Sequence, residues 1–298
     1  MTEILVAGVA VLDFVFDVGE FPRSPEKYRA KGAAIVGGGN AANSAVAISR
    51  LGGTARLASR IGDDPIADLI ENGLLQESVD CTYVKRFADK RSSFSSIYID
   101  DSGERQIMNF RDTGLSMDAD WLTNTFPSSV KAVLADTRWP DGAAVAMEKA
   151  RALNVPGIMD AEAPVMEAEA AIHAASHVAF SAQGVVEFTG IADVQKATMA
   201  ADEKLQGRVI VTDGENGVYV ADADGLKIYP AFDITPVDTL GAGDVWHGAF
   251  ALALAEAMPE ADAIRFASAA AAIKCTRPGG RDGAPTRTEV EEFLRAHS

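Results

Sequence analysis

Short apolar segments that alternate with helical segments constrain the fold of this chain more than any other feature of its sequence. From about residue 130 onward, four such segments lie at 132–134, 156–159, 178–180 and 209–212. Runs that are apolar throughout suit strands buried on both faces, and the stretches between them favour helices. A further buried strand is expected at 4–9. The alternation predicts an α/β fold, a doubly wound and mostly parallel sheet with helices on both faces.

A smaller β element is expected beside this sheet. Alternating apolar residues near 12–20 predict a half-exposed strand, and residues 94–110 flank a turn in the pattern of a β-hairpin. A late hairpin is expected across 223–225. The sequence shows no internal repeat and no low-complexity linker. We therefore expect one domain over residues 1–298, with a β lid formed by about 12–20 and 94–110 that covers a site.

Composition excludes several classes of function. The 43 acidic and 27 basic residues give a formal net charge of −16, and such a surface repels phosphate backbones and anionic headgroups. We therefore expect no nucleic-acid partner and no membrane binding. Two cysteines and four histidines are too few for a disulfide framework or a metal cluster. No apolar run is long enough to span a bilayer, and the start lacks the basic region of a signal peptide. The expected location is cytoplasmic.

The most informative motif is DTLGAGD at 238–244, which opens a predicted helix. The small residues Gly241, Ala242 and Gly243 let the backbone approach a ligand, and first-turn N–H groups have no partner inside a helix. Such a helix start suits an anion on which charge develops. The helix dipole is expected to keep Asp244 ionised, so that this carboxylate accepts a proton from a hydroxyl. Spacing alone leaves open that Asp244 is a helix cap beside a tight turn.

This motif resembles the signature of the ribokinase (PfkB) family of sugar kinases, and three other segments extend the resemblance over nearly the whole chain. GGGNAAN at 37–43, with LGG at 51–53, is similar to the family's N-terminal signature. VTDGENG at 211–217 is similar to its nucleotide-side strand and loop, and CTRPGG at 275–280 to its late adenine-side loop. The resemblance implies a ribokinase-like fold that phosphorylates a sugar hydroxyl, with ATP and Mg²⁺ as cofactors.

The resemblance also implies a role for individual residues. It makes Asp244 the catalytic base and makes the N–H groups of Gly241, Ala242 and Gly243 a hole for the transferring phosphoryl group. The residues that it places against the sugar are Asp13, Gly38, Gly39 and Asn43. The residues that it places against the nucleotide are Thr212, Gly214, Gly217, Gly241, Gly243 and Gly279. It sets Asp238 beside a monovalent-cation site, for which K⁺ is the expected ion.

One family element is missing from this sequence. The family's Asn-x-x-Glu, which helps to hold the water around magnesium, falls on SAQG at 181–184. Neither end of the motif matches. Glu187 lies three residues further on and is the candidate that replaces the missing glutamate in the magnesium shell.

Within the family, the sequence most resembles the sulfofructose kinase branch. The segments that carry this resemblance are LADTRW at 134–139, GERQIMN at 103–109, RFAS at 265–268 and KCTRPGGR at 274–281. It implies phosphorylation of the 1-hydroxyl of 6-deoxy-6-sulfofructose, with the sulfonate held by Lys27, Asn109 and Arg138. Ammonium, amide and guanidinium donors suit a tetrahedral anion.

Other interpretations stay open at this stage. Lys27 also fits a solvated charge, Arg138 an ion pair with a nearby aspartate, and Asn109 a pair across the hairpin. A sugar phosphate or acidic sugar would suit the same cradle, with fructose 6-phosphate, tagatose 6-phosphate and 2-keto-3-deoxygluconate as examples. Ribokinase or fructokinase activity is a further alternative. A non-catalytic sugar or nucleotide sensor is the alternative from another class, and a base at Asp244 argues against it. An apolar lid predicts a homodimer formed through the lid.

Overall fold

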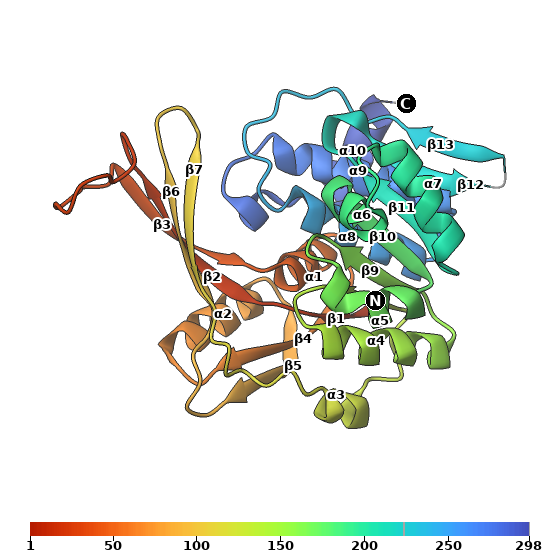
Figure 1. The fold of residues 1–298 in the computed structure, drawn as a ribbon, viewed down its shortest axis with the longest axis horizontal. Helices are drawn as coiled ribbons and strands as arrows, with labels where there is room; N and C mark the ends of the chain where they lie inside the picture. Colours follow the sequence, from red (N-terminus) through yellow and green to blue (C-terminus); the bar gives the residue numbers. More distant parts are fainter. Residues whose placement is uncertain (223, 298) are drawn as a thin grey trace.

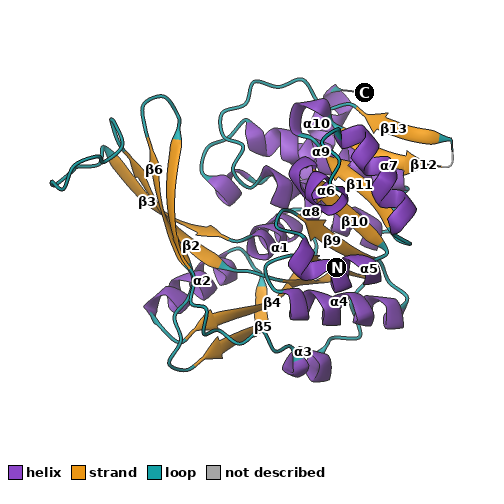
Figure 2. Ribbon diagram, in the orientation of Figure 1, coloured by secondary structure: helices purple, strands orange, loops and turns teal. Residues whose placement is uncertain are grey.

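The computed structural model describes residues 1–222 and 224–297, and its strands form two separate sheets (Figure 1 and Figure 2). In spatial order, the nine strands of the larger sheet are β13 (Gly225–Tyr229), β12 (Val218–Asp222), β11 (Arg208–Thr212), β10 (His177–Ser181), β9 (Gly157–Ala161), β8 (Ala132–Asp136), β1 (Glu3–Ala7), β4 (Thr54–Gly62) and β5 (Asp80–Phe87). Neighbouring strands are parallel from β11 to β5. Strands β12 and β13 add to the edge in the antiparallel sense, and Ala223 of the predicted hairpin turn lies outside the described residues. The predicted parallel sheet is confirmed.

Helices cover both faces of this sheet, also as predicted. The helices are α1 (Asn40–Arg50), α2 (Pro65–Gln76), α3 (Asp120–Thr125), α4 (Pro140–Leu153), α5 (Glu169–Ala174), α6 (Ala182–Thr189), α7 (Val194–Lys204), α8 (Ala242–Ala255), α9 (Glu260–Cys275) and α10 (Arg287–Ala296). Helices α1, α2, α8, α9 and α10 pack on one face, and α3 to α7 belong to the core on the other. Successive side chains of a strand point to opposite faces, so Ile4 and Leu5 of β1 belong to different cores.

The four-stranded sheet has the order β3 (Gly32–Gly38), β2 (Val11–Asp17), β6 (Phe94–Ile99) and β7 (Arg105–Phe110), and we call it the lid. It projects from one side of the larger sheet, on the left of Figure 1. The lid contains both segments expected from the sequence. It also contains β3, which the sequence analysis had not assigned to a strand, and β2 ends at Asp17, short of residue 20. Glycines at both ends of β3 hide the alternation that would mark it as a strand.

One aspartate fixes the edge of the larger sheet from which the site is built. Asp136, the last residue of β8, accepts hydrogen bonds from the N–H groups of Val9 at 2.8 Å and Ala41 at 3.0 Å. It therefore ties the loop after β1 to the first turn of α1. Gly8 is required beside it, because a Cβ atom there would lie 2.2 Å from the Asp136 carboxyl carbon. This edge holds the carboxyl ends of the parallel strands next to β1, where the strand order reverses, and ligands of open α/β sheets bind at that place.

Within the described residues, no helix combines the length and the apolar character that a membrane span requires.

Candidate active site

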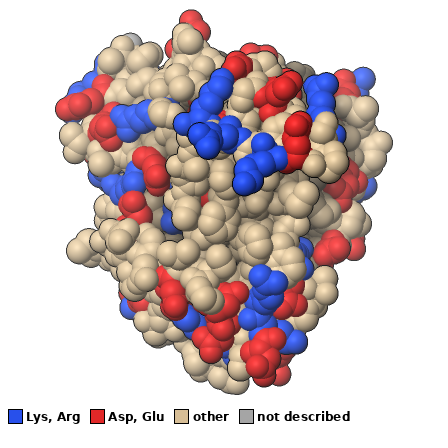
Figure 3. All heavy atoms as spheres, turned by 90° about the vertical axis from the view of Figure 1, so that its left-hand side faces the viewer, with Lys and Arg blue, Asp and Glu red and all other residues tan. Residues whose placement is uncertain are grey.

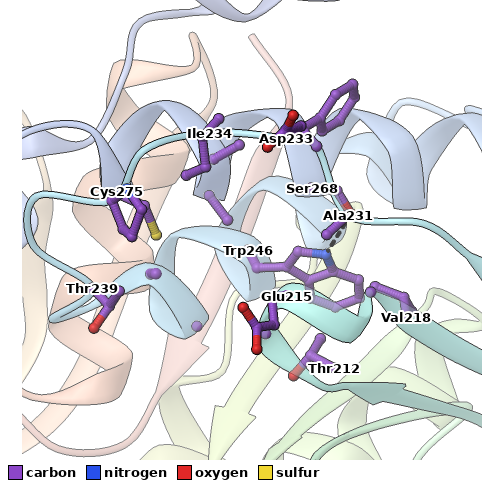
Figure 4. Close-up of a pocket in the computed structure, with 18 residues that line it drawn as sticks. Thr212, Glu215, Val218, Ala231, Asp233, Ile234, Thr239, Trp246, Ser268 and Cys275 are labelled. Carbon is purple, nitrogen blue, oxygen red and sulfur yellow. Dashed lines mark hydrogen bonds between the residues drawn. The ribbon is translucent and has the colours of Figure 1, made fainter.

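Two cavities meet at the start of α8. The smaller cavity, of about 380 Å³, lies between the lid and the carboxyl edge of the large sheet. The larger cavity, of about 630 Å³, lies beside β11, β12, α8 and α9 and is drawn in Figure 4. Thr239 and Gly243 line both cavities. A molecule bound in one cavity would therefore adjoin a molecule in the other at the first turn of α8.

The first turn of α8 is open to an anion. Its N-cap, Gly241, has a left-handed φ of 77°, and no side chain caps the helix. Within the described residues, the N–H groups of Gly241 and Gly243 have no hydrogen-bond acceptor. Gly241 and Gly243 line the smaller cavity, and Ala242 and Gly243 line the larger one. Unpaired N–H groups at the positive end of a helix dipole favour binding of an anion such as a phosphoryl group.

Asp244 follows this turn and lines the smaller cavity. The amide of Asn43 donates from Nδ2 to its Oδ2 atom at 2.7 Å, and the hydroxyl of Ser44 donates to its backbone oxygen at 2.9 Å. Helix α1 therefore holds the carboxylate in place. Burial raises the pKa of Asp244 to about 8, and the charge of Asp160 adds to this rise. Burial therefore opposes the helix dipole, which was expected to keep Asp244 ionised.

Further ionisable groups lie behind Asp244. Asp160 is buried in β9, and burial raises its pKa well above the ordinary value. His247, one turn after Asp244, is buried with Nδ1 at 3.5 Å from an Asp160 carboxylate oxygen, and burial lowers its pKa. Neither Asp160 nor His247 lines a cavity, so His247 packs within the fold. Glu162, just after β9, does line the smaller cavity and accepts a hydrogen bond of 2.9 Å from the amide of Asn40.

Four residues that the sequence analysis placed against a sugar lie together at the smaller cavity. Asp13, Gly39 and Asn43 line it. Gly38 packs behind Asp13, where a Cβ atom would lie 2.3 Å from the Oδ2 atom of Asp13. Burial raises the pKa of Asp13, while a hydrogen bond with Ser95 acts to lower it. The lid and α1 together thus present carboxylate and amide groups, which are the groups that bind sugar hydroxyls.

The larger cavity gathers most of the residues expected at a nucleotide. Thr212, Gly214 and Gly217 line it, whereas Gly279 does not. In Figure 4, the indole of Trp246 forms a wall of the cavity, and its Nε1 atom donates to the hydroxyl of Ser268 at 3.3 Å. The lining is a mixture of small, apolar and hydroxyl-bearing side chains with two acidic residues, Glu215 and Asp233, and such a mixed lining suits a flat heterocycle with polar edges.

The three residues expected to hold a sulfonate do not converge in this structure. Lys27 is exposed in the loop between β2 and β3. Figure 1 shows this loop at the outer end of the lid. Asn109 lies on the lid, where its Nδ2 donates to the Ser95 hydroxyl at 3.1 Å. Arg138 donates to Glu162 at 3.1 Å and to the Ala163 carbonyl at 2.8 Å. None of the three lines the smaller cavity.

The residues considered for metal ions are already paired with other groups. Glu187 accepts a hydrogen bond from the N–H of Val165 at 3.0 Å and lines neither cavity. Ser181, at the position of the missing family asparagine, caps α6 by accepting from the N–H of Gly184 at 3.0 Å. The carboxylate of Asp238 lies 2.9 Å from a nitrogen of Arg105. No cluster of three or more potential metal ligands occurs in the part of the chain that the structure describes.

Sequence reasoning assigned no role to three residues that line the smaller cavity. They are Arg105 from β7, Glu162 after β9, and Arg281 after α9. The Arg281 side chain is only 6% exposed, and its guanidinium group lies against Gly37, where a Cβ atom would lie 1.8 Å from Cζ. No periodicity marks these positions, because each comes from a loop or a lid strand far from the others in the sequence.

Comparisons with known proteins agree with this geometry. The model of the pfkB family of carbohydrate kinases matches residues 1–287. The chain is 29% identical to a ribokinase of Haemophilus influenzae over 297 residues, which cover 97% of each protein. It is 27% identical to a fructokinase of Vibrio alginolyticus over 285 residues, covering 86% of this chain and 91% of that protein.

Solved structures give the same assignment. A crystal structure of a candidate ribokinase from Agrobacterium tumefaciens is 37% identical and superposes with a TM-score of 0.93, covering 99% of this chain and 98% of that one. The ribokinase of Thermotoga maritima is 29% identical, with a TM-score of 0.85 over 99% of this chain and all of that one. With a mostly parallel sheet, a lid and an uncapped helix start between two cavities, the chain belongs to the pfkB family of carbohydrate kinases, which are ATP-dependent phosphotransferases.

Proposed function

We propose that this kinase phosphorylates a sugar that carries an anionic group, and that its substrate is 6-deoxy-6-sulfofructose, phosphorylated at the 1-hydroxyl. The observation that carries the proposal is Arg281, whose guanidinium lines the smaller cavity. Its side chain is nearly fully buried. Among residues 1–222 and 224–297, the guanidinium has no hydrogen-bond or ion-pair partner that would neutralise it. An anionic group on the substrate would supply that partner.

The cost of burying a charge explains why this matters. A buried guanidinium without a partner is strongly unfavourable, and an anion placed against it recovers much of that cost. The charges of Asp282, Glu77 and Asp13, in that order, act to raise the pKa of Arg281, but burial lowers it overall and none of the three carboxylates pairs with the guanidinium. Arg105, which also lines the cavity, is paired with Asp238. Among the described residues that line the smaller cavity, Arg281 is therefore the cation left for an anionic substituent, despite the strongly negative charge of the whole chain.

Asn109, Arg138 and Lys27, which the family resemblance places at the sulfonate, have supporting roles in this proposal. Asn109 lies on the same lid strand as Arg105, two pleats away, so both point to the same face. Arg138 reaches the cavity edge through Glu162, which it contacts. Lys27 belongs to the outer loop of the lid, and the proposal assigns it a contact with substrate only when that loop folds over the cavity.

The proposed reaction follows from the meeting of the two cavities. The sugar binds against Asp13 and Asn43, and ATP binds along Thr212, Gly214 and Gly217. Asp244 takes the proton of the attacking hydroxyl, and the N–H groups of Gly241 and Gly243 stabilise the oxygens of the phosphoryl group in transfer. The N–H of Ala242, which the resemblance also placed in this hole, donates to the Thr239 carbonyl at 3.2 Å. A carboxylate with a raised pKa is a stronger base, so the pKa of about 8 suits this role.

Magnesium fits the site as a companion of the nucleotide. Mg²⁺ commonly binds one or two carboxylates together with phosphate oxygens and water, so a cluster of three protein ligands is not required. Glu162 lines the smaller cavity, where Asn40 and Arg138 donate to its carboxylate, whereas Glu187 is held by Val165 and lines neither cavity. We therefore assign Glu162, in place of Glu187, to the magnesium shell. When bound, the ion neutralises charge on the phosphates.

The experiment is ADP release by the purified protein with ATP and Mg²⁺ over a small panel of sugars. The panel contains sulfofructose, fructose 6-phosphate, tagatose 6-phosphate, 2-keto-3-deoxygluconate, fructose and ribose. We expect the highest kcat/KM for sulfofructose, with neutral sugars far behind. Arg281→Gln should reduce kcat/KM for the anionic substrate by about 100-fold, the usual cost of removing one partner of a buried charge pair. Arg151→Gln, on the exposed side of α4, is the matched control and should change little.

Each other outcome has a defined meaning. Preference for a sugar phosphate would mean that the substrate is anionic but carries a phosphate in place of the sulfonate. Preference for ribose or fructose would refute the proposal and favour the activity named for the relatives. If Arg281→Gln lowers kcat/KM equally for anionic and neutral sugars, Arg281 is a structural residue. Nucleotide binding without turnover of any sugar would favour the sensor alternative.

A further inference from the structure

A fully buried lysine lies directly behind the anion hole. Lys274, in the last turn of α9, has a side chain that is 0% exposed. Lysines are almost never buried to this degree unless their charge is paired. The ammonium nitrogen donates to the backbone oxygen of Asp238 at 2.6 Å and lies 3.2 Å from the Oδ2 atom of the same residue. One residue thus provides both a carbonyl and a carboxylate oxygen to this cation.

Asp238 is in turn held from several directions. Its carboxylate accepts hydrogen bonds from the N–H groups of Leu240 at 2.9 Å and Gly280 at 3.1 Å. Arg105 of the lid contacts it at 2.9 Å. Although burial acts to raise the pKa of Asp238, these N–H groups and Lys274 lower it overall, so the carboxylate is ionised. Its backbone N–H and that of Val237 both donate to the carbonyl of Cys275.

These contacts fix the segment that leads into the anion hole. Only two residues separate Asp238 from Gly241, whose left-handed conformation starts α8. The ammonium of Lys274 therefore sits on the inner side of the loop whose N–H groups face both cavities. A small shift of this loop would move those N–H groups away from a bound phosphoryl group.

The family resemblance implied a monovalent cation beside Asp238, and the residues present do not fit one. Such an ion needs carbonyl and carboxylate oxygens that are free to coordinate it. Here the backbone oxygen and Oδ2 of Asp238 already contact an ammonium group. A second cation within hydrogen-bond distance of these oxygens would lie against the charge of Lys274, with Arg105 as a third positive group.

We propose that Lys274 is a built-in cation that takes the place of K⁺ and positions the Asp238–Gly241 loop. The kinase then needs no monovalent ion from solution for nucleotide binding or turnover. Lys274 is a positioning residue, because it touches the loop and neither cavity. The proposal does not depend on which sugar is the substrate, because its effect on ADP binding is measured without a sugar.

The first arm of the test uses the unchanged protein. Affinity for ADP, measured by calorimetry, and ADP release with the best sugar of the panel are compared in potassium chloride and in tetramethylammonium chloride of equal ionic strength. We expect the same values in both salts. A several-fold gain in ADP affinity or turnover with K⁺ would overturn the proposal, and this arm involves no variant that could fail to fold.

The second arm removes the ammonium group. In tetramethylammonium chloride, Lys274→Ala should lose about 100-fold in turnover, as expected when catalytic groups are displaced slightly. It should also bind ADP more weakly, and K⁺, ammonium or methylammonium should restore both values and raise the melting temperature. Lys131→Ala, at an exposed position, should show none of these responses. If Lys274→Ala binds ADP as tightly as the unchanged protein, or regains nothing from small cations, Lys274 is only a structural residue.

Discussion

At the scale of single residues, burial and hydrogen bonding act in opposite directions on Asp244. Burial and the nearby Asp160 raise its pKa, and the hydrogen bond from Asn43 acts to lower it. Burial prevails, because one amide donor offers less to the carboxylate than the water that it lost. The result is a carboxylate that binds a proton readily, at the position where we propose that the hydroxyl proton is accepted. The Oδ1 atom of Asn43 has no hydrogen-bond partner among the residues that the structure describes, which leaves an acceptor near the same place.

The raised pKa of Asp244 predicts how stability depends on pH. A carboxyl group with a folded pKa of about 8 and an ordinary value of 3.8 binds more protons in the folded state between these limits. The free energy of unfolding therefore falls as pH rises through this range. Asp244→Asn removes the cost, so its melting temperature should exceed that of the unchanged protein at pH 8, with no difference below pH 3.8.

Thermal unfolding at several pH values checks this prediction. Glu291→Gln, an exposed carboxylate on α10, serves as the control and should show no such pH-dependent gain. Equal melting temperatures for Asp244→Asn and the unchanged protein at both ends of the range would mean that the Asp244 carboxylate is well solvated in solution.

At the scale of elements, the lid sheet has two different faces. Asp13, Ser95 and Asn109 are register partners across β2, β6 and β7, and they share the face toward the smaller cavity. The neighbouring row on the opposite face contains Ile35 and Met108, which are 58% and 73% exposed. Figure 3, which faces the lid side, shows uncharged surface between groups of charged residues. Exposed apolar side chains grouped on one sheet face favour contact with another chain.

The lid therefore carries a prediction about assembly. We propose that two copies of the chain pair through the outer lid faces, as the sequence analysis expected. Light scattering coupled to gel filtration should give the mass of a dimer, and Met108→Glu should give that of a monomer because it places a charge in the interface. Met166→Glu is the matched control, since Met166 is an exposed methionine away from the lid. A monomeric mass for the unchanged protein, or a dimer that survives Met108→Glu, would contradict this assembly.

At the scale of the whole molecule, the parts that the sequence predicted are those with a local signal. Strands β8 to β11 each contain a short apolar run, and the motif that opens α8 contains its own glycines and carboxylate. These features therefore appear in the sequence pattern without knowledge of the fold. Strand β4 carries Arg56 and Arg60, whose charges interrupt an otherwise buried strand, and it was not predicted.

The rest of the site depends on contacts between distant segments. Arg281 reaches the smaller cavity from the end of α9, and Lys274 meets Asp238 across 36 positions of the chain. The roles proposed for Arg281 and Lys274 depend on how deeply each side chain is buried and on whether a charged group pairs with it. No short sequence pattern encodes either property. Lys27 shows the reverse case, because a match in sequence did not bring its side chain to the cavity in this structure.

The central claim is that chemistry occurs where the two cavities meet, with Asp244 as the base. The most direct test is the turnover number of Asp244→Asn with the best sugar of the panel, measured by ADP release beside the affinities for sugar and ADP. We predict that turnover falls by about 100-fold or more while both affinities change little, because the asparagine amide fills the same space as the carboxylate but accepts no proton. Turnover close to that of the unchanged protein would contradict the account and would remove Asp244 as the base.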